Sequence, residues 1–158
     1  MSTGYKVLVL GHLVCVIGAL GALGYNGLYL TLARRRSAET AVGVLEVNSQ
    51  VSGLGELLFY AAFIFGLAAV GASNSVWKFS QAWVSIAFVV FLVEVGIIHG
   101  WIRRHQRAFV RTAAGGPPEV AALDSLERRI ALGWGAFNVL ALVLIYLMVF
   151  KPGAPGGG

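Results

Sequence analysis

The sequence predicts an all-α, polytopic membrane protein, an antiparallel bundle of four transmembrane helices. Four long apolar runs carry this prediction, at residues 6–33, 53–72, 80–102 and 130–150. Each run has about the 20 residues that a helix needs to cross ~30 Å of hydrocarbon. The composition agrees, because 58% of the residues are hydrophobic and only 12% are charged. In 158 residues, four spans leave room for one membrane domain and no second one.

Helices are favoured over the strands of a β-barrel. A spanning segment must satisfy its own backbone hydrogen bonds, which only helices and closed barrels achieve. Barrel strands alternate polar and apolar residues over about ten positions. The stretch Val84–Val93 is apolar without such alternation, so each run is predicted to be a helix.

The first run, residues 6–33, is rich in small residues. Gly18, Ala22 and Asn26 recur every four positions on one stripe, and Gly11 falls near the same face. Small residues let helices approach closely in lipid. The stripe is expected either to pack within the bundle or to receive a helix of another protein.

The later runs differ in how they are connected. The connection at 73–79 is short and predicts a tight antiparallel hairpin. Helix 3 is expected to continue into the cytoplasm until Gly115–Pro118 breaks it, and Pro118 is well placed to open an extended helix 4. The segment 34–52 is expected to be a loop that lies partly at the interface, and 152–158 a flexible tail of low complexity.

The basic residues predict the orientation in the membrane. Segments rich in Lys and Arg beside spans stay in the cytoplasm. Nine of the twelve lie in the segments after the first and third runs, and the other side holds only Lys6, Lys78 and Lys151. We therefore expect a multi-pass protein of the bacterial cytoplasmic (inner) membrane, with both termini outside and loops 34–52 and 103–129 in the cytoplasm. Topology explains this charge, so nucleic acid is not an expected partner.

Polar residues in the cytoplasmic halves of the four runs are predicted to lie at similar depths. Helical rise places most of them ~10 Å from the nearer helix end, and a carboxylate at that depth must face the bundle interior or be protonated. We therefore expect Glu94 to meet partners from other helices, either as a structural network or as a proton-accepting or ligand-binding site. The cluster comprises Asn26, Tyr60, Glu94 and Asn138, with Glu56 and His99 nearer the interface.

Cofactor sites have weaker signals. His12 and Cys15 are spaced i, i+3 on one helical face, and Met148 falls in the same leaflet. Imidazole, thiolate and thioether together suit Cu(I). Haem bound by His12 with another ligand is a further alternative, whereas His99 and His105 lie in the opposite leaflet from His12.

The two ends of the sequence resemble a group of bacterial integral membrane proteins with four spans and no assigned activity. The resemblance rests on the opening Lys6–His12, the glycines after it, the arginine run that closes the first helix, and the ending Tyr146–Gly153. The early histidine also resembles two groups of small membrane proteins, the CopD copper-resistance type and the HemJ type of haem-binding oxidase. The HemJ resemblance implies a haem-ligand role for His12.

Three classes of function remain open from the sequence. We find no catalytic set, which favours an accessory or assembly subunit of a larger membrane complex, bound to other membrane subunits or to itself within the lipid bilayer. A haem-linked or redox enzyme would use His12. A small proton-coupled transporter would use Glu94.

Overall fold

The computed structural model describes residues 2–74, 76–115 and 120–153, and within these ranges every regular element is helical. The all-α prediction is therefore confirmed. The elements, in chain order, are α1 (Thr3–Leu23), α2 (Asn26–Arg34), α3 (Ala38–Gly71), α4 (Ala82–Gly96), the π-helix η1 (Ile97–Ile102), α5 (Arg103–Ala114) and α6 (Val120–Phe150).

Four continuous helical stretches are long and apolar enough to cross a membrane: Thr3–Arg34, Ala38–Gly71, Ala82–Ala114 and Val120–Phe150. Each coincides with one predicted span, to within two residues where the prediction extends further, so the four-span membrane bundle is confirmed. The main difference lies in the predicted loop 34–52, most of which is the first part of α3. Ser37 caps this helix by accepting the backbone N–H of Thr40 at 3.0 Å.

Two expectations fall wholly or partly outside the described residues. The helix start at Pro118 is one, because the described part of α6 begins at Val120. The flexible tail is the other, because the description ends with a turn at Pro152–Gly153.

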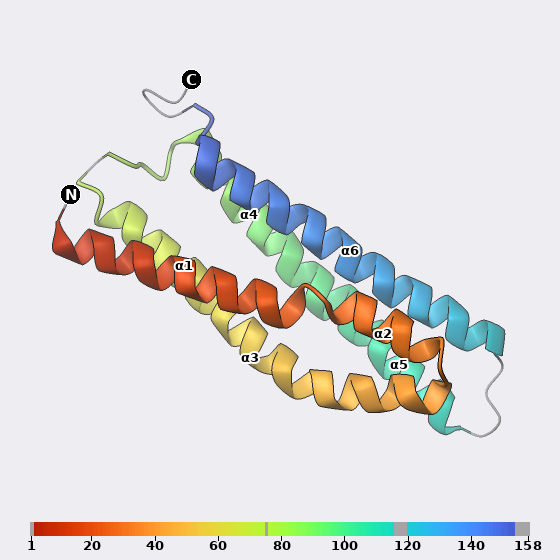
Figure 1. Ribbon diagram of the computed structural model, residues 1–158. Coiled ribbons are helices and arrows are strands. Elements are labelled where there is room, and N and C mark those ends of the chain that lie inside the picture. Colours follow the sequence, from red (N-terminus) through yellow and green to blue (C-terminus); the bar gives the residue numbers. More distant parts are fainter. Residues whose placement is uncertain (1, 75, 116–119, 154–158) are drawn as a thin grey trace.

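The helices form two antiparallel pairs that lie side by side (Figure 1). In the first pair, α1 and α2 pack along α3; in the second, α4, η1 and α5 pack along α6. Both termini and the 72–81 connection lie at one end of the bundle, and the half nearest them is called the terminal half. The other half holds the predicted arginine-rich segments and is called the arginine half.

The arginine half contains most of the core. Here α2 contacts α6, and α3 contacts α5, so the two pairs are tied together. Phe109, Phe137, Ile102 and Ile130 are fully buried within one continuous cluster. The terminal half has a much smaller buried cluster, formed by Trp83, Val84 and Leu147 on α4 and α6.

The first span is broken between α1 and α2, at Gly24 and Tyr25. A break frees backbone groups that lipid cannot satisfy. The side-chain amide of Asn138 donates to the Gly24 carbonyl at 2.9 Å, from α6. Asn26, at the start of α2, donates to Ser52 Oγ at 2.9 Å. Asn138 therefore satisfies a carbonyl at the break, and Asn26 holds the start of α2 against α3.

The small-residue stripe of α1 lies against α3. A Cβ on Gly18 would come within 2.7 Å of Leu58, and one on Gly11 within 3.2 Å of the Phe65 ring. The two helices are equally close at Ala22, because a Cβ on Gly55 of α3 would lie 2.8 Å from the methyl group of Ala22. Such spacing brings two helices close in lipid, so this stripe serves the packing of α1 on α3.

Candidate functional site: a cavity in the terminal half

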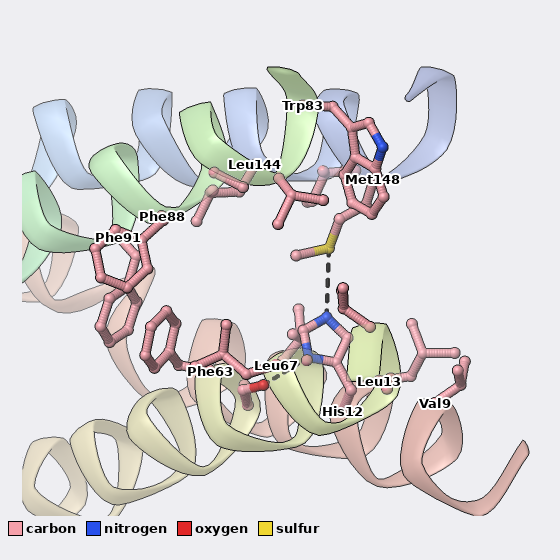
Figure 2. A pocket seen from close by; sticks show the side chains of 18 of the residues that line it. Val9, His12, Leu13, Phe63, Leu67, Trp83, Phe88, Phe91, Leu144 and Met148 are labelled. Carbon is pink, nitrogen blue, oxygen red and sulfur yellow. Dashed lines mark hydrogen bonds between the residues drawn. The ribbon is translucent and has the colours of Figure 1, made fainter. Parts of the chain in front are cut away.

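A cavity of about 280 Å³ separates the two helix pairs in the terminal half. Figure 2 shows it bounded by α1 and α3 on one side and by α4 and α6 on the other. Its wall is almost entirely apolar. The aromatic residues Phe63, Phe88 and Phe91 lie together at one end of the cavity in this view. Ligand sites in proteins are typically concave and apolar with a few polar groups, and this cavity has that character.

The cavity is long relative to its volume. On α4 its lining extends from Trp83 to Glu94, which is ~16 Å at the helical rise. Its outer end is marked by Lys151, whose Nζ lies 4.5 Å from the centroid of the Trp77 ring. Its inner end is Glu94. The cavity thus connects the interfacial end of the bundle with a carboxyl group deep in the span.

Glu94 is fully buried, and neither of its carboxyl oxygens has a hydrogen-bond partner among the described residues. The expected partners do not reach it: Asn26 bonds Ser52, Asn138 bonds Gly24, and the hydroxyl of Tyr60 contacts His99. The expected hydrogen bonds from these three residues to Glu94 are therefore not formed among the described residues. The break in the first span explains the difference, because it engages both asparagines elsewhere.

The remaining polar residues of the predicted cluster form a separate group in the arginine half. Arg103 donates to Glu56 Oε2 at 2.6 Å, and His99 Nε2 lies 3.8 Å from the same oxygen. The same His99 nitrogen is 2.6 Å from the Tyr60 hydroxyl. His99 lies in the π-helix η1, and π-helical turns often occur at functional sites. This group joins α3 to the second helix pair by ionic and hydrogen-bonded contacts.

His12 and Met148 meet across the terminal end of the cavity (Figure 2). His12 Nδ1 lies 2.7 Å from the Ala62 carbonyl oxygen, and its Nε2 lies 3.4 Å from Met148 Sδ. Cys15, the third expected donor, is buried and does not line the cavity. The structure thus brings together two of the three residues proposed for Cu(I).

The described residues contain no group of three or more His, Cys, Asp or Glu side chains placed to hold a metal ion. His12 lies in the terminal half, whereas His99 contacts Tyr60 and Glu56 in the arginine half. His105 bonds the Trp101 carbonyl there. A pair of histidines binding one haem within the described chain is therefore not formed.

Comparison with protein-family models, with curated proteins and with solved structures finds no match for this chain. The resemblance to bacterial four-span proteins, and that of the early histidine to the CopD and HemJ types, stays a prediction.

The cavity itself was missed by reasoning from the sequence. Its lining residues are apolar and look like ordinary core positions in a span. One signal was present: Glu94 falls in a run of apolar residues with no charged neighbour on its own helix turn. An acid in that setting implies either a partner or a cavity, and tertiary structure was needed to choose between them.

Proposed function

We propose that this membrane protein binds a small, elongated apolar molecule that carries one hydrogen-bonding polar group. The apolar part occupies the cavity of the terminal half, and the polar group meets Glu94 at its inner end. The observation that carries the proposal is Glu94, which lines the cavity and whose fully buried carboxyl oxygens have no partner among the described residues.

Leaving the buried Glu94 carboxyl group without a hydrogen bond has an energetic cost. A buried polar group without a partner costs about 1–3 kcal/mol, and more if it is charged. Intramembrane acids that persist at such a cost usually face a cavity or a partner. A hydroxyl or amine group of a ligand would supply the missing hydrogen bond in either protonation state of the carboxyl.

Access from the lipid supports an apolar ligand. Leu13 on α1 and Ile145 on α6 both line the cavity and are exposed on the outer surface of the bundle. In a membrane, that surface faces acyl chains. A molecule dissolved in the bilayer would thus enter laterally between these two helices, without crossing water.

The accessory-subunit hypothesis has less support from the geometry. The small-residue stripe that motivated a docking surface on α1 is in contact with α3. The transporter hypothesis shares Glu94 with our proposal and adds a requirement for movement, because buried residues such as Phe137 and Ile102 fill the arginine half. Binding is therefore the step on which either activity would depend.

A pair of matched probes tests the proposal. We would compare 1-decanol with decane as stabilisers of the purified protein in lipid nanodiscs, measuring the midpoint of thermal unfolding. Decanol should raise the midpoint more than decane does, because only the alcohol can bond Glu94. The preference corresponds to about tenfold in affinity for one hydrogen bond of ~1.4 kcal/mol.

Two variants assign the effect to the cavity. Glu94→Leu should abolish the preference for decanol, whereas Glu39→Gln, at an exposed acid of α3, should retain it. Ala87→Leu, which adds volume to the cavity wall, should reduce binding of both probes. Equal stabilisation by decanol and decane in the unmodified protein would count against a polar contact at Glu94.

A further inference from the structure

We propose that His12 Nε2 and Met148 Sδ form a binding site for a soft monovalent metal ion of the Cu(I) class. The two atoms lie 3.4 Å apart at the terminal end of the cavity. The site is independent of the ligand-binding function assigned to Glu94, because it uses different residues at the other end of the cavity.

The hydrogen bond to Ala62 determines which nitrogen of the His12 ring carries the hydrogen. The Ala62 carbonyl oxygen can only accept a hydrogen bond, so His12 Nδ1, 2.7 Å away, must carry the hydrogen. In a neutral imidazole the other nitrogen, Nε2, then has a lone pair and no hydrogen. That lone pair faces the thioether sulfur of Met148, which is also an acceptor.

In that tautomer no hydrogen links Nε2 to the sulfur, so both lone pairs are available to a metal ion. A metal ion satisfies both lone pairs at once. A bond from Nδ1–H to a backbone carbonyl is also one of the contacts that orient metal-binding histidines, since it fixes the tautomer and raises the basicity of the free nitrogen. His12 therefore has the supported geometry of a ligand before any ion binds.

The distance between the donor atoms fits a shared ion. With bond lengths like those of zinc sites, about 2.0–2.1 Å to nitrogen and about 2.3 Å to sulfur, the two bonds would meet at an angle of about 100° when the donors are 3.4 Å apart. That angle is close to tetrahedral, so the separation of the two donor atoms is compatible with one shared ion. The remaining coordination positions face the cavity, where a small exogenous ligand can complete them.

The donor types select the ion. A thioether is a soft ligand that favours Cu(I) over Mg²⁺ or Ca²⁺, and imidazole also suits copper. Both donors are neutral, so a monovalent ion brings the smallest charge into the low-dielectric interior. Trp83 and Met148 both line the cavity (Figure 2), and an indole face attracts a cation.

The test is a titration of the purified, detergent-solubilised protein with Cu(I) under anaerobic conditions, in competition with bicinchoninate. The parent chain carries Cys15→Ala, because a thiol would bind Cu(I) at another position, and Cys15 does not line the cavity. We expect one Cu(I) per chain. X-ray absorption of the loaded protein should show one sulfur and at least one imidazole nitrogen bound to copper.

Two variants attribute the ion to this pair. Met148→Leu keeps the side-chain volume nearly unchanged and should weaken binding at least tenfold, with loss of the sulfur signal. His105→Ala, a histidine of the arginine half, should leave the affinity unchanged. If the parent binds no Cu(I), or if Met148→Leu retains both the affinity and the sulfur signal, the proposal is overturned.

Discussion

The two halves of this bundle use the same helices in opposite ways. In the arginine half, apolar side chains from both helix pairs interlock, and ionic contacts tie the pairs together. In the terminal half, the pairs are separated by an apolar cavity that a His–Met contact bridges. The packed half therefore holds the fold, which leaves the terminal half free to carry a site.

This division explains the placement of the polar residues. In the arginine half, Arg103 and Glu56 are partners, and Tyr60 and His99 are partners. Glu94 and His12 both line the cavity: the Glu94 carboxyl oxygens have no hydrogen-bond partner among the described residues, and His12 Nε2 lies 3.4 Å from the Met148 sulfur. Satisfied polar groups rigidify a bundle, whereas unsatisfied ones that line a cavity indicate a ligand.

The largest expected effect on the free energy of unfolding is the difference between truncating a tightly packed residue and truncating a residue of the cavity wall. Phe137 is fully buried and packs edge-on against Phe59, with ring centroids 5.7 Å apart. Phe137→Ala should lower the free energy of unfolding by about 3 kcal/mol. Leu144→Ala, in the cavity wall, should cost about 1 kcal/mol, because the side facing the cavity has few contacts to lose.

Equilibrium unfolding in mixed micelles, followed by circular dichroism, gives both values. Equal losses for the two variants would show that the terminal half is packed as tightly as the arginine half, and would remove the contrast.

An intermediate effect is expected at the ion pairs of the arginine half. Glu56 is 9% exposed, so Arg103→Gln would leave its carboxylate nearly buried without its 2.6 Å partner. The free energy of unfolding should fall by about 2 kcal/mol. The double variant Glu56→Gln/Arg103→Gln should recover part of this loss, because no unpaired charge then remains.

Arg34→Gln is the matched control, because it also removes an arginine from an ion pair. Its partner Asp124, at 2.8 Å, is 58% exposed although Arg34 itself is 15% exposed. The carboxylate left without Arg34 is therefore solvated, and the pair should contribute less than about 1 kcal/mol. A loss at Arg34 as large as that at Arg103 would mean that burial does not set the strength of these contacts.

The smallest effect on stability is expected for single cysteine substitutions at exposed positions, which test the orientation of the bundle in the membrane. We expect the arginine half to face the cytoplasm, since segments rich in arginine are retained there. Single cysteines at Ser2 and at Glu39, both exposed, would be introduced into the Cys15→Ala chain. A membrane-impermeant maleimide should label the Ser2 position in intact cells and the Glu39 position only after permeabilisation; the reverse pattern would invert the topology.

The sequence predicted less of the site than of the fold. The depth argument placed Glu94 correctly in an apolar span but joined it to the wrong partners, because a regular first helix was assumed. The break at Gly24 and Tyr25 has no proline to announce it. It exists because Asn138, 114 residues away, satisfies the exposed carbonyl, and a contact of that kind depends on the whole bundle.

The sequence by itself determined the number of spans, their antiparallel order and the uneven distribution of charge. Hydropathy and charge are properties of each segment and need no neighbour. Only the tertiary structure decided that the pairs close at Phe137 and separate near His12. That choice depends on how side-chain volumes from several helices fill shared space, which no single segment encodes.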